Sequence, residues 1–163
     1  MGMRKVIFLD RDGVIIKERG DYNYLPDHII MVDGIVEAMK KITDAGYDII
    51  IVSNQGGVGK GLYKNRDVKF INDSIRQFFK TYGINILDVI YCPHHHDITA
   101  CICRKPDSLM IEKMLHMYHI DPEMSWMIGD NERDREAGLK AGLKTLLIES
   151  NDDLNIHLKS MGI

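Results

Sequence analysis

The feature that most limits how this chain can fold is a regular alternation of short apolar runs with longer segments of helical period. Runs rich in β-branched and aliphatic residues predict five strands, at residues 6–9, 48–52, 87–91, 126–128 and 145–148. Between them, apolar residues recur on one helical face at residues 34–45, 66–82, 108–119 and 133–141. Strands that alternate with helices predict right-handed crossovers and a mainly parallel α/β sheet covered on both faces.

The length of 163 residues fits one domain with its own core. The chain has no repeat, no low-complexity segment and no proline- or serine-rich linker. We therefore predict a single domain over residues 1–163, built on a doubly wound, Rossmann-like sheet. The interval from Asp12 to Ser53 leaves room for one helix and a modest loop, so we expect no separate cap domain.

Charge and hydropathy exclude several classes of protein. A net charge of -3 argues against a general nucleic-acid binder, which needs a basic face. No apolar run approaches the ~18 residues of a membrane span, and the first ten residues lack the apolar region of a signal peptide. We expect a cytoplasmic monomer that binds neither nucleic acid nor membrane.

All three cysteines lie in the stretch CPHHHDITACICRKP, at residues 92–106. Together with a histidine they form the ligand set of a closed tetrahedral zinc site, and the candidate ligands are Cys92, His94, Cys101 and Cys103. His95 and His96 follow directly and could take the place of His94. A closed site has no position for substrate, so we expect the zinc to fix the loop that carries Arg104 and Lys105.

Polar groups follow three of the predicted strands. Asp10 and Asp12 come directly after the first strand, and two carboxylates this close favour a bound cation such as Mg²⁺. Residues 53–61 follow the second strand and combine a hydroxyl and amides with glycines whose N–H groups can approach an anion. Asp130 follows the fourth strand. Because ligands bind at the carboxyl ends of parallel strands, the sequence predicts a site for phosphate and Mg²⁺ there.

Four motifs occur in the order FLDRDGV, SNQ, CRKP and IGDNERD. Together they resemble the four motifs of the haloacid dehalogenase (HAD) superfamily of phosphatases, over nearly the whole chain. The Cys-Pro-His followed by Cys-x-Cys-Arg-Lys-Pro is similar to the zinc-containing branch of that superfamily, which includes heptose bisphosphate phosphatases and histidinol-phosphatases.

The resemblance implies a mechanism. Asp10 would be the nucleophile that forms an aspartyl-phosphate, and Asp12 the general acid and then the general base. Ser53 and Lys105 would stabilise the phosphoryl oxygens. The implied Mg²⁺ ligands are Asp10, the Asp12 backbone carbonyl and Asp130, with Asn131 contributing to the metal site through its backbone or through water.

The resemblance also implies a substrate. Residues 59–63 and 18–22 resemble two substrate-binding segments of heptose bisphosphate phosphatases, although Asp21 is inserted ahead of Tyr22. After CRKP, residues 107–110 replace the usual x-P-G-M. We therefore expect hydrolysis of a sugar bisphosphate, D-glycero-D-manno-heptose 1,7-bisphosphate, to the 1-phosphate. The implied substrate-binding residues are Glu18, Arg19, Gly20, Asp21, Asn54, Gln55, Lys60 and Arg104.

Three other interpretations compete with this one. Within the same branch, the chain could be a histidinol-phosphatase. A phospho-accepting receiver domain also places acids, a hydroxyl and a lysine at strand ends, but it carries no cysteine cluster. The third alternative is a binding module in which zinc orders residues 92–106 for contact with a partner protein.

Overall fold

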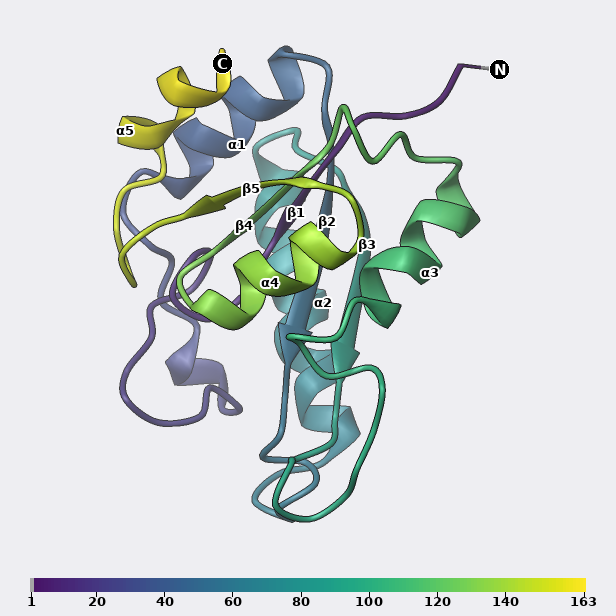
Figure 1. Ribbon diagram of the computed structural model, residues 1–163. Coiled ribbons are helices and arrows are strands. Elements are labelled where there is room, and N and C mark those ends of the chain that lie inside the picture. The colour runs from purple at the N-terminus through teal and green to yellow at the C-terminus, as the bar shows by residue number, and fades with distance from the viewer. Residues whose placement is uncertain (1) are drawn as a thin grey trace.

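The computed structural model describes residues 2–163, which form one parallel sheet with helices on both faces (Figure 1). The sheet has five strands in the order β3-β2-β1-β4-β5. Their bounds are Val6–Leu9 (β1), Asp48–Asn54 (β2), Ile86–Cys92 (β3), Trp126–Gly129 (β4) and Lys144–Leu147 (β5). All four neighbouring pairs are parallel. The predicted α/β class and doubly wound sheet are therefore confirmed.

Two hydrophobic clusters cover the two faces of the sheet. The longer helices are α1 (Ile35–Asp44), α2 (Asn65–Thr81), α3 (Leu109–Tyr118) and α4 (Glu132–Lys140). Side chains of α1 and α2 pack with Ile7 and Leu9 on one face. Side chains of α3 and α4 pack with Val6 and Phe8 on the other. Successive residues of β1 thus point into opposite cores, as a strand buried on both faces requires.

The segment after β5 differs most from expectation. It forms α5 (Asn155–Leu158) and a 3₁₀ turn, η2 (Lys159–Met161), beside α1 (Figure 1). The sequence predicted neither element, because four residues carry too little helical period to detect.

Between β1 and α1, the described chain holds only the 3₁₀ turn η1 (Pro26–His28) and no cap domain. No helix of the described chain has the length and hydropathy needed to span a bilayer.

The strand order fixes where polar side chains meet. β1 is central, and the chain passes from it to β2 on one side and later to β4 on the other. Asp10 follows β1, Ser53 ends the buried part of β2, and Asp130 follows β4. These groups converge at the carboxyl edge of the sheet, at the point where the strand order reverses.

Candidate active site

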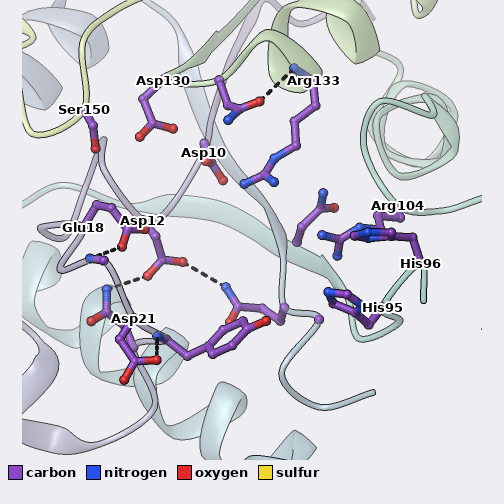
Figure 2. Close-up of a pocket in the computed structure, with 17 residues that line it drawn as sticks. Asp10, Asp12, Glu18, Asp21, His95, His96, Arg104, Asp130, Arg133 and Ser150 are labelled. Carbon is purple, nitrogen blue, oxygen red and sulfur yellow. Dashed lines mark hydrogen bonds between the residues drawn. The ribbon is translucent and has the colours of Figure 1, made fainter. Parts of the chain in front are cut away.

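A cavity of about 680 Å³ opens at this carboxyl edge (Figure 2). Most of the residues predicted from the sequence line it, namely Asp10, Asp12, Glu18, Gly20, Asp21, Asn54, Gln55, Arg104, Asp130 and Asn131. Ser53 and Lys105 are buried behind its wall. Arg19 and Lys60 are exposed and do not line the cavity, and the Lys60 ammonium instead lies 5.9 Å from the ring centroid of Tyr22.

Asp10 and Lys105 form a buried ion pair at the floor of the site. The Lys105 ammonium donates to Asp10 Oδ1 at 2.9 Å and to the Val52 carbonyl at 2.7 Å, and it lies 2.7 Å from Asp134 Oδ1. Burial, opposed by the Lys105 charge, raises the pKa of Asp10 to about 7. Burial alone would lower the pKa of Lys105, but the two carboxylates outweigh it and raise that pKa.

Three carboxylates and one ammonium meet here, which leaves an excess of negative charge. Asp10, Asp130 and Asp134 each offer an oxygen within 4.8 Å of the others. Asp10 and Asp134 contact Lys105, whereas Asp130 forms no ion pair with any residue that the structure describes. Burial also raises the pKa of Asp130, against the opposing effects of a hydrogen bond from Ser150 and the charge of Arg133. A hard divalent cation with oxygen ligands fits this cluster, on the side of Asp10 and Asp130.

Gly13 allows the chain to pass close to Asp130. Its φ is +88°, and a Cβ at this position would overlap the carboxylate of Asp130 and the hydroxyl of Ser150. Glycine adopts this backbone conformation at little cost, whereas other residues do not. The Asp-Gly pair thus lets the loop after β1 turn beside the carboxylate that follows β4.

Asp12 is held by side chains from three segments. Arg11 donates to both of its carboxylate oxygens, at 3.0 and 3.2 Å. Asn23 donates to Oδ1 at 2.7 Å, and Gln55 donates to Oδ2 at 3.0 Å. The Asp12 side chain keeps 20% of its surface exposed. It is therefore fixed in position while one edge still faces the cavity.

Arg11 is fully buried, and the sequence analysis did not single it out. Besides Asp12, its guanidinium donates to Asn72 Oδ1 at 3.3 Å and to Gln55 Oε1 at 3.0 Å. Tyr63 also donates to Gln55 Oε1, at 2.9 Å, and its ring stacks on Tyr24. The only indication of this role in the sequence is that Arg11 lies between two acids, Asp10 and Asp12, at the end of a strand. Its partners lie up to 61 residues away and leave no local pattern.

Two cavity residues predicted to bind substrate, Asn54 and Glu18, also support their neighbours. The amide of Asn54 donates to the Lys105 carbonyl at 2.9 Å and accepts from the Lys105 N–H at 3.0 Å. It therefore fixes the backbone that carries the buried ammonium. Glu18 Oε1 accepts the N–H groups of Arg19 and Gly20, at 2.9 and 2.7 Å, and so shapes its own turn.

One turn at the start of α4 carries several functional groups. Asn131 Oδ1 accepts the Arg133 N–H at 3.2 Å, and the Asn131 N–H donates to Asp134 Oδ2 at 3.1 Å. This capping box fixes Asp130 before the helix and Asp134 within its first turn. The side-chain oxygen of Asn131 is used by the cap, whereas this residue was expected to contribute to the metal site through its backbone or through water. Asp134 lies 2.7 Å from the Lys105 ammonium, a contact across 29 positions that leaves no local pattern in the sequence.

The cysteine cluster forms a compact centre beside the cavity. Cys92 Sγ lies 3.7 Å from Cys101 Sγ and 3.2 Å from Cys103 Sγ, while His94 Nδ1 lies 3.5 and 3.3 Å from Cys92 and Cys103. Ligands about 2.3 Å from a tetrahedral zinc are separated by ~3.8 Å, so the four atoms fit this ion. All three cysteines are free thiols. Burial raises the pKa of the Cys92 thiol to about 12, so a thiolate there requires a cation.

The neighbouring histidines lie elsewhere. The rings of His95 and His96 stack on each other, with centroids 4.3 Å apart, and both line the cavity. His95 Nδ1 accepts the Asp97 N–H at 3.2 Å. The structure therefore brings His94, rather than its two neighbours, to the cysteines.

Comparisons with known proteins agree with this site. Residues 102–159 match a model of the HAD-hydrolase-like family. The chain is 41% identical over 145 residues to the D-glycero-alpha-D-manno-heptose-1,7-bisphosphate 7-phosphatase of Photorhabdus laumondii, covering 85% of this chain and 79% of that protein. It is 33% identical to the histidine biosynthesis bifunctional protein HisB of Legionella pneumophila, over 90% of this chain but only 42% of that protein.

Solved structures give the same result. The D,D-heptose 1,7-bisphosphate phosphatase of B. bronchiseptica, complexed with magnesium and phosphate, superposes with a TM-score of 0.84. The match covers 95% of this chain and 86% of that one, at 28% identity.

The fold and the acids at its strand ends define a HAD-like phosphatase, and the chain belongs to that family. Within the family it resembles the D-glycero-D-manno-heptose-1,7-bisphosphate 7-phosphatases. The resemblance drawn from the four sequence motifs is thus confirmed, and the receiver-domain alternative is not supported.

Proposed function

We propose that this chain is a Mg²⁺-dependent phosphatase that removes the 7-phosphate of D-glycero-D-manno-heptose 1,7-bisphosphate by way of an aspartyl-phosphate. The observation that carries the proposal is the position of Asp10. It follows the central strand, contacts Lys105 and opens onto a cavity shared with Asp12 and Asp130. The 41% identity to a 7-phosphatase of this sugar bisphosphate supports the choice of substrate.

Asp10 is suited to attack phosphorus. Its Oδ1 accepts from Lys105, which also donates to the Val52 carbonyl and lies 2.7 Å from Asp134 Oδ1. This arrangement holds the carboxylate in one orientation and leaves its other oxygen for the attack on the phosphoryl group. Covalent catalysis by a carboxylate divides a difficult hydrolysis into two easier displacements.

The metal would be held by Asp10, Asp130 and the backbone carbonyl of Asp12. When bound, Mg²⁺ neutralises negative charge that develops on the phosphoryl oxygens. The magnesium and phosphate in the B. bronchiseptica relative support this assignment. Asn131 orients the turn that carries Asp130 and does not need to be a direct ligand.

Asp12 would protonate the leaving alkoxide and then activate the water that hydrolyses the intermediate. General acid–base catalysis needs a carboxyl group held at a fixed distance from the reacting oxygen. Arg11, Asn23 and Gln55 provide that restraint without closing the cavity. The same network keeps the residue in place through both half-reactions.

Zinc would have a structural role. With Cys92, His94, Cys101 and Cys103 all on the ion, no coordination position remains for water or phosphate. The loop from residue 92 to residue 106 has no regular structure between β3 and α3, and four metal bonds would remove much of its conformational freedom. Arg104 and Lys105 emerge from its end, so zinc would act by holding these two cations.

Histidinol phosphate is the second candidate substrate, because the chain is 33% identical over 147 residues to a histidine biosynthesis protein. That substrate carries one phosphate and a cationic amine. The Arg104 and Arg133 guanidiniums in the cavity would repel the amine, whereas they would attract a second phosphate.

The experiment that tests the proposal compares substrates. Purified protein in Mg²⁺ is given the α- and β-anomers of heptose 1,7-bisphosphate, histidinol phosphate and fructose 1,6-bisphosphate. We expect the highest kcat/KM with a heptose bisphosphate, since kcat/KM reports discrimination in the transition state. A higher value with histidinol phosphate, or no Mg²⁺-dependent release from any of the four esters, would reject the proposal.

A further inference from the structure

The cavity is divided into an acidic side and a basic side. Figure 2 shows Asp130, Asp10, Asp12, Glu18 and Asp21 on one side, facing Arg133, Arg104, His95 and His96 on the other. The acidic side carries the nucleophile and the residues suited to a metal. The basic side has no role in the displacement at phosphorus itself, so it is available to bind another part of the substrate.

Arg133 is the cation on this side that lacks a partner. Within residues 2–163 its side chain forms no ion pair or hydrogen bond, and its Nε is buried without an acceptor. By contrast, Arg135 on the same helix pairs with Glu132 at 2.9 Å. A buried N–H without an acceptor is unfavourable, and an acceptor supplied by a ligand would relieve it.

Arg104 lies near Arg133 and is also free to bind an anion. Its only side-chain hydrogen bond among the described residues is one of 3.0 Å to the His94 carbonyl, which orients the guanidinium without neutralising its charge. His96, Arg104 and Arg133 line both the main cavity and a smaller one of about 360 Å³ beside it. These three side chains therefore stand together at the junction of the two cavities.

We propose that Arg133, together with Arg104, binds the second phosphate of the substrate, the one that is not transferred. The inference rests on the proposed function, because it requires a bisphosphate. The reacting phosphate already has a cationic site formed by Lys105 and the metal. Guanidinium groups suit the remaining phosphate, because their planar donors match its oxygens and their charge is permanent.

The capping box explains why the position of Arg133 is well defined. Its N–H is held by Asn131, and the turn continues directly from Asp130. One short segment thus presents a carboxylate to the metal and a guanidinium to the second phosphate. Lys60, which the sequence analysis expected to bind substrate, lies outside the cavity, so Arg133 supplies a cation that the sequence analysis did not assign.

The test measures the ratio of two activities. Arg133→Gln is compared with wild type on heptose 1,7-bisphosphate and on heptose 7-phosphate, which lacks only the second phosphate. We expect kcat/KM to fall roughly 10- to 100-fold on the bisphosphate, the range for one lost charge-assisted hydrogen bond, and less than about threefold on the monophosphate. Arg133→Lys, which keeps the charge, should recover part of the loss.

Arg135→Gln is the matched control, because Arg135 is on the same helix but does not line the cavity. It should leave both activities unchanged. Equal losses on the two substrates in Arg133→Gln would place Arg133 at the reacting phosphate and overturn the inference, and so would an unchanged bisphosphate activity. Failure of the proposed function is seen separately, as the absence of bisphosphate hydrolysis by the wild-type protein, and would remove the inference with it.

Discussion

The Lys105 ammonium lies 2.9 Å from Asp10 Oδ1 and 2.7 Å from Asp134 Oδ1, in a position where all three side chains are at most 7% exposed. Lys105 follows the cysteine loop, Asp10 follows β1, and Asp134 lies in α4. A single cation therefore joins three segments that are far apart in the sequence. It links the position of the nucleophile to the loop that the proposed zinc would order.

Removing this cation should affect stability as well as activity. Lys105→Met leaves Asp10 and Asp134 buried without their positive counter-charge, so we expect a loss of roughly 3–5 kcal/mol in the free energy of unfolding at pH 8. Urea denaturation of the variant and of the wild-type protein measures this difference in the free energy of unfolding. Adding Asp134→Asn to Lys105→Met should recover part of the stability, because it removes one of the unpaired charges. Lys113→Met, at an exposed position of α3, is the control and should change little.

The raised pKa of Asp10 predicts a pH-dependent stability in metal-free protein. Its ordinary pKa is 3.8 and its folded value is about 7, so the folded state binds more protons than the unfolded state between these values. The contribution of Asp10 to stability therefore falls as pH rises from about 4 to 7. The Asp10→Asn variant has no carboxyl group to ionise at this position, so it does not lose this stability as the pH rises. We expect its Tm to exceed that of wild type at pH 8, by about 4 °C for ~1–2 kcal/mol in a chain of this length.

Thermal melts of the two proteins at several pH values, in the presence of a chelator, measure this difference. The difference in Tm should shrink as the pH falls from 7 toward 4, and it should vanish below the unfolded pKa of 3.8, where the carboxyl group is protonated in both states of the wild-type protein. Added Mg²⁺ should stabilise the wild-type protein at pH 8 more than it stabilises the variant. A variant that is less stable than wild type at pH 8 would contradict the prediction.

The network around Asp12 predicts an effect that depends on the leaving group. Tyr63→Phe removes the hydroxyl that donates to Gln55, which in turn donates to Asp12. Looser positioning should lower kcat about tenfold, or ~1.4 kcal/mol, for a sugar phosphate, whose alkoxide needs a proton. An aryl phosphate with a good leaving group should lose less. Tyr24→Phe, in the same aromatic stack, is the matched control, and equal losses on both esters would argue against the role of the network.

The proposed zinc should be bound independently of Mg²⁺. We expect elemental analysis to find one zinc per chain in protein purified without chelators, including protein stripped of Mg²⁺. Cys101→Ser should lose the zinc, and added Mg²⁺ should not restore its activity. His96→Gln changes a neighbouring histidine outside the cluster and should keep the zinc. Full activity and no zinc in Cys101→Ser would show that the cluster has no structural role.

The local pattern of the sequence was sufficient to predict the architecture and the edge of the sheet at which the candidate site lies. Five apolar runs and four amphipathic segments predict the sheet and the main helices, because each is long enough to show its period. Asp10 and Asp130 could be assigned to one site, since parallel strands end at the same edge. The Cys-x-His and Cys-x-Cys spacings similarly indicated the compact cysteine cluster.

The contacts that the sequence did not reveal are long-range. Arg11 reaches Asn72 and Gln55, and Lys105 reaches Asp10 across 95 positions. Such pairs depend on how the segments pack, which no local period encodes. Arg133 lies at the start of a helix, and only the fold shows that it lines the cavity. Lys60 is the opposite case. The sequence indicated that it binds substrate, but it does not line the cavity.

The central claim is that Asp10 carries the phosphoryl group during turnover. The most direct measurement is an acid quench of the enzyme turning over bisphosphate labelled with radioactive phosphorus at the 7-phosphate, followed by mass spectrometry of the peptide that contains Asp10. We expect label on this peptide that hydroxylamine releases, as is typical of an acyl phosphate. We also expect Asp10→Asn to have no label and less than about a thousandth of the wild-type kcat, a loss above ~4 kcal/mol. Label on another residue, or an Asp10→Asn variant that still turns over at a tenth of the wild-type rate, would contradict the claim.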